Sequence, residues 1–137
     1  MLFSNITGKN NLKDQVLSLF NSNRVPHALL FNGNEGSGSF QLALSFAQLL
    51  LCTKPLKSDS CGKCSSCIKV QKMMHPDLHF SFPIQLSQTN KVTISDDLLD
   101  VFIEMTIESP FFSKEQWLDR MGNRNKQGII GTKESQQ

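Results

Sequence analysis

Apolar residues recur at helical spacing near the start of the chain. The segment 9–22 has apolar residues three or four positions apart, which predicts an amphipathic helix. These apolar positions are Leu12, Val16, Leu19 and Phe20. Pro26 disfavours helix at the residue before it. The short apolar run 27–32 that follows has the length and composition of a buried strand.

A glycine-rich loop separates this predicted strand from a longer apolar segment. Residues 33–40 read GNEGSGSF. Residues 39–51 are apolar on most faces, which predicts a helix that is buried on more than one side. A strand, a loop and a helix in this order are typical of an α/β fold with a parallel sheet, and we expect this fold class.

Apolar and polar residues alternate with a period of two further along the chain. The alternation over 78–84 predicts a second strand, with Pro83 near its end or on a sheet edge. Its apolar positions are Leu78, Phe80, Phe82 and Ile84. The polar segment 85–90 that follows is expected to be an exposed loop.

Two more helices are predicted in the last third of the chain. Ser95 comes directly before the helical pattern of 96–108 and is placed to cap that helix. Ser113 and Gln116 have the spacing of a capping box in front of a helix that begins at residue 114.

Composition and charge allow a packed core and exclude several classes of protein. The chain has 137 residues, of which 39% are hydrophobic and 19% charged, so it can bury a core. The net charge of +2 is too small to argue for nucleic-acid binding by itself. No apolar run reaches the roughly 18 residues of a membrane span. The first ten residues lack the pattern of a secretory signal, so a cytoplasmic location is expected.

The glycine loop has the spacing of a phosphate-binding loop but not its reactive side chains. Such a loop reads G-x-x-x-x-G-K-[ST]. Gly33 and Gly38 match, but Ser39 and Phe40 stand where the lysine and the hydroxyl residue belong. We therefore expect no ATP hydrolysis and assign no catalytic residue. The backbone at Gly33, Gly36, Gly38 and Ser39 can hold an anion, and a turn without any ligand is the alternative.

Four cysteines follow with the spacing of a metal site. Cys52, Cys61, Cys64 and Cys67 read C-x8-C-x2-C-x2-C within a polar module over 52–70. Four thiolates suit tetrahedral Zn²⁺ and leave no position open for water, so the site is expected to be structural. An iron–sulfur cluster and four unliganded thiols are the alternatives, although the Cys-Pro of ferredoxins is missing. His75 is an alternative ligand.

Five lysines surround the cysteine module. They are Lys54, Lys57, Lys63, Lys69 and Lys72, opposed by Asp59 alone. One interpretation is that they balance the negative charge of a metal–thiolate site. Binding of DNA is the other.

Two further groups of side chains have both a structural and a functional interpretation. One helix face carries carboxylates four residues apart, at Asp96, Asp100 and Glu104, and a solvated face is favoured over a metal site. An aromatic group, consisting of Phe111, Phe112 and Trp117, is interpreted as core rather than as a partner-docking cluster.

Four segments in order carry a resemblance to a known family. They are NRVPHALLFNGNEGSGS, LLLC, CGKCSSC and HPDLHFSFP. Together they resemble the N-terminal part of the delta-prime family of the bacterial DNA polymerase III clamp loader. The resemblance covers about residues 5–85. It is weaker over 86–122, which looks like an elaboration of unknown role.

The resemblance implies an AAA+ fold with a zinc module that projects from it. Residues 1–137 would be part of a nucleotide-binding-type domain, roughly the first third of such a protein. It also implies a member of a ring with delta and gamma/tau subunits that does not hydrolyse ATP. That ring loads the sliding clamp on primed DNA and belongs to an assembly classed as a DNA-directed DNA polymerase. The arginine finger of the family would lie beyond Gln137.

Two alternative functions stay open at this point. The gamma/tau family of the clamp loader shares the apolar run, the glycine loop and the four cysteines, but it hydrolyses ATP and keeps the lysine and threonine that this chain lacks. The other alternative is a stand-alone zinc-knuckle protein that binds nucleic acid, with the lysines of 54–72 as its contact residues.

Overall fold

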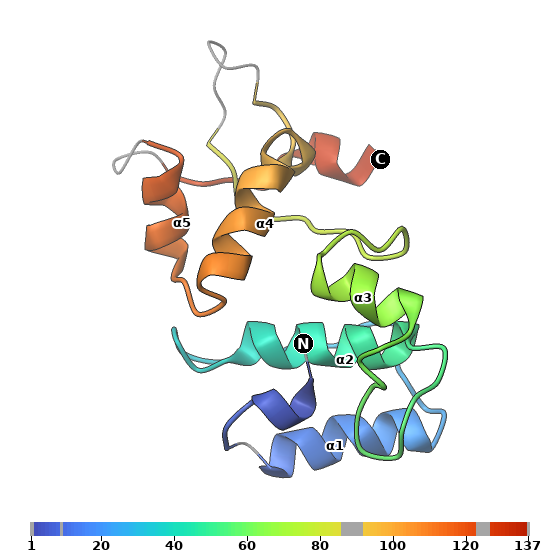
Figure 1. Ribbon diagram of the computed structural model, residues 1–137. Helices are drawn as coiled ribbons and strands as arrows, with labels where there is room; N and C mark the ends of the chain where they lie inside the picture. The colour runs from blue at the N-terminus through green and yellow to red at the C-terminus, as the bar shows by residue number, and fades with distance from the viewer. Residues whose placement is uncertain (1, 9, 86–91, 123–126, 137) are drawn as a thin grey trace. The chain divides into compact units, whose positions relative to one another are not determined.

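The chain folds into two compact units. A computed structural model describes residues 2–8, 10–85, 92–122 and 127–136 (Figure 1). The first unit ends at Leu78 and the second begins at His79. The metal-ligand candidates and the glycine loop both belong to the first unit, and the two units are described separately below.

The first unit is built around one central helix. Its elements are η1 (Phe3–Asn5), α1 (Asn10–Asn21), α2 (Ser39–Leu51) and α3 (Ser65–Gln71). Helices α1 and α3 and the short η1 all contact α2 (Figure 1). The helices predicted over 9–22 and 39–51 are therefore confirmed as α1 and α2.

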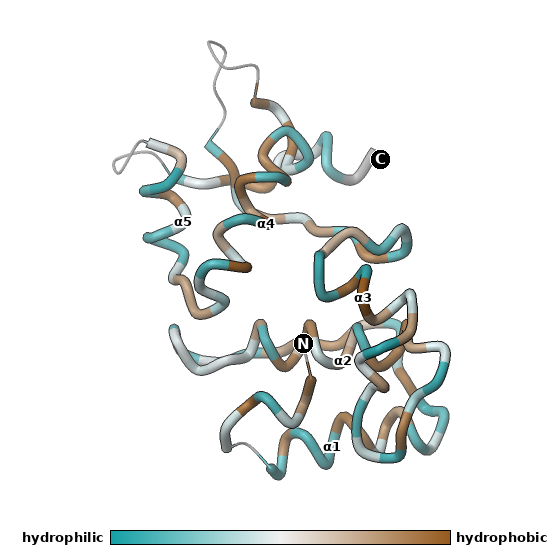
Figure 2. The backbone as a smooth tube through the Cα atoms, viewed as in Figure 1, coloured by the Kyte–Doolittle hydropathy of each residue, from teal (hydrophilic) through white to brown (hydrophobic). Residues whose placement is uncertain are grey.

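The core of this unit forms where α1 and η1 meet α2. It consists of Phe3, Val16, Leu42, Phe46 and Leu49. Polar side chains of α2 are also buried, among them Gln48, which has no exposed surface. Figure 2 shows the hydrophobic stretches that α2 carries along its length. The prediction that this helix is buried on more than one side is confirmed.

The strand predicted over 27–32 does not form. These residues have no regular secondary structure, and the side chain of Leu30 is 91% exposed. An apolar run forms a strand only where a neighbouring strand satisfies its N–H and C=O groups. No such neighbour lies among the residues that the structure describes, and the expected parallel sheet is not found there.

The second predicted strand is reduced to a single bridge. Ile84 pairs with Ile129 in an antiparallel bridge, with both N–H···O distances at 2.9 Å. Burial does follow the predicted alternation, because Phe82 and Ile84 are buried while Ser81 is exposed. Gln85 is buried, against the exposed loop predicted over 85–90, and the rest of that segment lies outside the described residues.

The second unit consists of short helices. They are η2 (Ser95–Leu98), α4 (Leu99–Glu108), α5 (Lys114–Arg120) and η3 (Thr132–Gln136). The helix predicted over 96–108 is found, but its first turn is a 3₁₀ helix. The described part of the predicted elaboration, 92–122, thus supplies α4 and α5.

Ser95 does not cap that helix with its own side chain, contrary to the prediction. Its N–H and its hydroxyl both donate to the carboxylate of Glu134, which is 39 residues away. The carboxylate of Asp97 instead accepts the N–H groups of Thr93 and Ile94, and these bonds lower the pKa of Asp97. The side chain of Ser95 is taken up by this long-range contact.

A group of aromatic rings in contact forms the core of the second unit. Phe102 of α4 lies at its centre, with ring centroids 4.2 Å from Phe82 and 5.5 Å from Trp117. The indole Nε1–H of Trp117 donates to the carbonyl oxygen of Pro83 at 2.6 Å. Trp117 is buried and Phe112 packs edge-on against Phe102, so the core interpretation holds for these two; Phe111 is 58% exposed.

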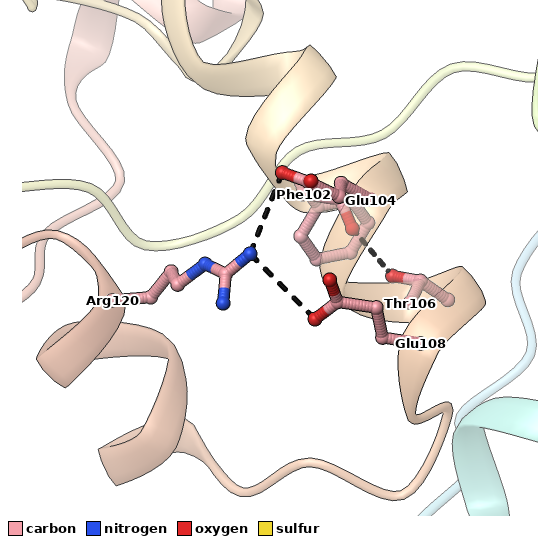
Figure 3. A network of polar contacts seen from close by, with 5 residues as sticks. All are labelled: Phe102, Glu104, Thr106, Glu108 and Arg120. Atoms are coloured by element: carbon pink, nitrogen blue, oxygen red, sulfur yellow. Dashed lines mark hydrogen bonds and ion pairs between the residues drawn. The ribbon is translucent and has the colours of Figure 1, made fainter.

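The acidic face of α4 is paired with a cation rather than assembled into a metal site. Arg120 Nη2 lies 3.4 Å from a carboxylate oxygen of Glu104 and 3.6 Å from one of Glu108 (Figure 3). Asp96 and Asp100 are exposed. Within the described residues the acidic side chains form no ligand cluster, which favours the solvated face.

The capping box in front of α5 gives a first testable prediction. The N–H of Gln116 donates to the Ser113 hydroxyl at 3.1 Å, and the N–H of Ser113 donates to Gln116 Oε1 at 2.8 Å. We expect Ser113→Ala to lower the free energy of unfolding of this unit by about 1 kcal/mol. Urea denaturation followed by the fluorescence of Trp117 measures it. Ser81→Ala, at an exposed position, is the control, and an equal effect of both would contradict the prediction.

Candidate metal centre

The four cysteines are brought together by the end of one helix and the start of another. Cys52 directly follows α2, and Cys67 lies in the first turn of α3. Cys61 and Cys64 lie in the irregular segment between the two helices, with Cys64 as the N-cap residue of α3. The predicted module 52–70 is therefore irregular only up to Cys64, and α3 within it was not foreseen.

The positions of the sulfur atoms fit a single four-coordinate metal ion. All four Sγ atoms lie within 4.8 Å of one another. The Cys52 and Cys64 sulfurs are 4.0 Å apart, and those of Cys61 and Cys67 are 3.9 Å apart. Tetrahedral Zn²⁺ with bonds of about 2.3 Å requires sulfur separations of roughly 3.8 Å. A disulfide needs about 2.05 Å, so the arrangement suits a metal ion and not a covalent pair.

Backbone N–H groups point at the sulfurs, as a thiolate site requires. The N–H of Cys61 donates to Cys52 Sγ at 3.3 Å. The N–H of Cys64 donates to Cys61 Sγ, and the N–H of Cys67 to Cys64 Sγ, each at 3.4 Å. Hydrogen bonds to a charged sulfur favour the thiolate, because they are stronger to the anion than to the neutral thiol.

The pKa values of the thiols separate accordingly. The Thr53 hydroxyl and the N–H of Cys67 lower the pKa of Cys64 to about 5. The N–H groups of Lys63 and Cys64 lower the pKa of Cys61. Burial raises the pKa of Cys67 to about 12. A metal ion that takes all four sulfurs has to displace the proton of Cys67, so binding releases protons and weakens as the pH falls.

Polar contacts tie the module to α2 and to the N-terminal turn of the first unit. The buried Gln48 of α2 donates from Nε2 to the Ser60 hydroxyl at 2.8 Å. The carboxylate of Asp59 accepts the N–H groups of Phe3 at 3.2 Å and Ser4 at 3.1 Å. The segment before Cys61 therefore holds the N-terminal turn η1 in place, a role of Asp59 that its sequence position did not indicate.

His75 lies outside the sulfur cluster. Its side chain is buried, and its Nδ1 accepts the N–H of Asp77 at 3.1 Å. Among the described residues the candidate ligands are the four cysteines without a histidine. The structure therefore gives His75 a local structural contact rather than the place of an alternative ligand.

The glycine loop leads directly into α2. Gly36 and Gly38 have φ angles of +69° and +77°, in the left-handed region that favours glycine, and Ser39 is the first residue of the helix. A Cβ at Gly33 would overlap Ser37 Oγ, so no side chain fits there without a shift. The sequence therefore located the turn and the helix start correctly, and it missed Ser37.

Ser37 faces the inside of this turn with a hydroxyl that has no partner. Its Oγ is buried and makes no hydrogen bond in the described part of the chain. The pocket beside the loop, about 210 Å³, includes Ser39, but most of its lining is apolar. It is formed by Leu12, Gln15, Val16, Leu19, Leu29, Leu30, Phe31, Asn32, Ser39 and Leu42. Apolar walls suit neither a triphosphate nor a magnesium ion.

A four-cysteine cluster suited to a metal ion follows the C-terminal end of α2, and a glycine loop with the spacing of a phosphate-binding loop precedes its N-terminal end. Together these two features define the class of protein. Comparison with known proteins gives this class a family. The chain belongs to the family described as "DNA polymerase III, delta subunit", which matches residues 8–118.

Curated relatives agree with this assignment. The DNA polymerase III subunit delta' of Bacillus subtilis is 35% identical over 82 residues, which cover 57% of this chain and 25% of the relative. The corresponding subunit of Pseudomonas aeruginosa is 31% identical over 78 residues, 57% of this chain and 24% of the relative. The subunit tau/gamma of Haemophilus influenzae is 29% identical over 98 residues, 72% of this chain and 14% of the relative.

The matched part of each of these relatives is short. The alignments span about a quarter of the delta' subunits and a smaller share of tau/gamma. No solved structure matches the chain. In the described residues, no helix is both long and apolar enough to cross a membrane.

Proposed function

We propose that the chain is the N-terminal part of a delta-prime-type subunit of the DNA polymerase III clamp loader. In this proposal it is a member of the ring that loads the sliding clamp, and it does not itself hydrolyse ATP. The family match and the delta' relatives support a subunit of DNA polymerase III. Its direct partners are then the delta and gamma/tau subunits. It acts on the sliding clamp and primed DNA indirectly, through the assembled ring.

One observation carries the choice of a subunit that does not hydrolyse ATP. Ser39 and Phe40 form the first turn of α2, where a phosphate-binding loop has its lysine and its hydroxyl residue. The lysine would contact the β- and γ-phosphates, and the hydroxyl would hold magnesium. Serine has no charge, and phenylalanine has no oxygen. In this proposal the backbone turn only directs the chain into α2 and can bind an anion at most. The turn is formed by Gly33, Gly36, Gly38 and Ser39.

The metal in this proposal is Zn²⁺, bound by Cys52, Cys61, Cys64 and Cys67. The sulfur separations of 3.9 and 4.0 Å and the all-thiolate donor set support it. Four sulfur ligands close the coordination shell, so the ion stabilises the fold and takes no part in chemistry. The proposal also includes a domain assignment. Residues 1–137 are part of an AAA+ nucleotide-binding-type domain, in which the module 52–70 is inserted after α2 and the segment 86–122 is an elaboration.

A gamma/tau-type subunit is the second candidate function. The tau/gamma subunit of Haemophilus influenzae aligns with more of this chain than the delta' subunit of Bacillus subtilis does, at lower identity. Such a subunit would bind and hydrolyse ATP at the start of α2.

Nucleotide binding separates the two candidates. We expect no magnesium-dependent binding of fluorescently labelled ATP to the chain at millimolar nucleotide, because two of the groups that grip the phosphates and the metal are missing. Fluorescence anisotropy with and without EDTA measures it, and a gamma/tau subunit is the positive control. Tight binding that disappears with EDTA would contradict the proposal and favour the second candidate.

A further inference from the structure

The positive charge of the chain is concentrated in the metal module. Of its 14 lysines and arginines, five lie in residues 52–72, with one of its 12 acidic residues. This segment carries a charge of +4 with its cysteines protonated and about +2 with Zn²⁺ held by four thiolates, while the rest of the chain carries −2. The lysines are all exposed: Lys54, Lys57, Lys63, Lys69 and Lys72. We call these five side chains the lysine surface.

The lysine surface does not serve the metal site directly. The sulfurs of the cysteines accept hydrogen bonds from backbone N–H groups and from Thr53 rather than from lysine ammonium groups. The one acidic residue of the segment, Asp59, is occupied by the N–H groups of Phe3, Ser4 and Ser60. Across the described residues, none of the five lysines forms an ion pair. Their charge is directed to solvent.

Structural contacts fix the segments that carry these lysines. Lys69 and Lys72 are three residues apart at the end of α3, so they lie on one side of it. Gln71 Nε2 donates to the Gly62 carbonyl oxygen and ties the turn of Lys63 to the same helix. Asn21 Nδ2, at the end of α1, donates to the Lys57 carbonyl oxygen. Figure 2 shows the hydrophilic stretches of this loop between α2 and α3.

The chemistry of this surface fits a chain of phosphates better than a protein. Protein interfaces are depleted of lysine and rely on aromatic residues, methionine and arginine. Residues 52–72 contain no aromatic residue, no methionine and no arginine. Lysine is a flexible point charge that suits phosphate oxygens, and phosphate contacts carry no sequence information. Without an aromatic ring the surface has no side chain on which bases could stack.

We propose that the lysine surface of the metal module binds the phosphate backbone of nucleic acid without reading its sequence. This inference goes beyond the proposed function. There the metal module only stabilises the fold, whereas here it contacts nucleic acid directly. The inference rests on the placement of the lysines and not on the glycine loop, so the ATP-binding result leaves it unchanged.

Salt-dependent binding of labelled DNA tests the proposal. If four or five lysines contact phosphates of duplex DNA, a plot of log K against log salt concentration should have a slope of about −4. This slope corresponds to a loss of roughly a few hundredfold in affinity between 50 and 200 mM salt. Lys69→Gln with Lys72→Gln should reduce the slope to about −2. Lys54→Gln with Lys57→Gln, on a different segment, should do the same. Fluorescence anisotropy with a duplex of mixed sequence and with a scrambled duplex measures both slope and sequence dependence.

A matched control separates a local surface from overall charge. Lys114→Gln with Lys133→Gln makes the same change in net charge at two exposed lysines of the second unit. It should leave the slope unchanged, and all three variants should keep the metal content of the original protein. The proposal is overturned if the original protein shows no salt-dependent binding at 50 mM salt, or if the control loses as much affinity as the two module variants. It is also overturned if polyglutamate competes as well as DNA at equal charge, which would indicate an acidic protein partner.

Discussion

Replacing Cys64 by serine is expected to release the zinc ion that we propose and to unfold the segment between α2 and the end of α3. The substitution removes one of the four candidate sulfur ligands, whose Sγ atoms all lie within 4.8 Å of one another. Serine is itself a favourable N-cap residue, so it keeps the local signal that starts α3. Any loss of structure therefore reports on the metal and not on the helix cap.

The size of this effect follows from the coupling of metal binding to folding. Structural zinc sites bind with apparent free energies of about 10–16 kcal/mol, which is as large as the whole stability of a small domain. The released segment includes Ser60 and Asp59, which contact Gln48 of α2 and the N-terminal turn η1. We therefore expect the melting transition of the first unit to broaden and to move to lower temperature as well.

Elemental analysis and circular dichroism measure the two parts of this result. The original protein should contain about one zinc ion per chain, and Cys64→Ser should lose most of it and part of its helical signal. Ser65→Ala, at the exposed neighbouring position, is the control and should keep both. Equal metal content in the original protein and in Cys64→Ser would contradict the assignment of Cys64 as a ligand. Iron together with visible absorbance would indicate an iron–sulfur cluster instead of zinc.

Replacing Phe102 by alanine is expected to abolish the fold of the second unit. Its ring meets four other aromatic rings, with centroid distances between 4.2 and 5.8 Å. They belong to Phe80, Phe82, Phe112 and Trp117. Truncating a buried phenylalanine costs about 3–5 kcal/mol, because transfer energy is lost and a cavity remains. A small helical unit has little more than that in total.

Trp117 is a direct reporter of this loss. It is the only tryptophan of the chain, it is buried, and it packs against Phe102. Its emission in Phe102→Ala should already be that of an exposed indole without denaturant. Phe111→Ala is the matched control, because the same side chain is removed from a position that is 58% exposed. It should change the free energy of unfolding by less than about 0.5 kcal/mol, and equal effects of the two variants would refute the aromatic core.

Local patterns identified the helices well. The spacing of apolar residues located α1 and α2 to within a residue, and the capping box located the start of α5. Helix hydrogen bonds join residues four apart, and a capping box joins residues three apart, so the information is contained in short windows. The strands predicted over 27–32 and 78–84 depended instead on partners that no local window contains.

In the candidate site, too, local spacing predicted some features and long-range contacts decided others. The sequence pattern named all four residues of the sulfur cluster, but the overlapping C-x2-C units explain only the proximity of Cys61, Cys64 and Cys67. Cys52 stands nine residues before Cys61 and reaches the cluster because α2 ends there. Ser95 was assigned a local cap, yet its polar groups bind Glu134 far along the chain. The long-range role of Asp59 was likewise hidden, since an acidic residue in a loop has no pattern of its own.

Residue identity and local spacing were enough to place α1, α2 and the start of α5, to group the four cysteines, and to show that Ser39 stands where a phosphate-binding loop has its lysine. These features depend on residue identity and on spacings of no more than about nine residues along the chain. The distances between the sulfurs and the carboxylate that holds η1 became known only from the folded chain. The tertiary structure also decided that the five lysines are exposed around the metal module. The reason is physical: burial, hydrogen-bond partners and charge environment belong to residues that are distant in sequence and become neighbours only when the chain folds.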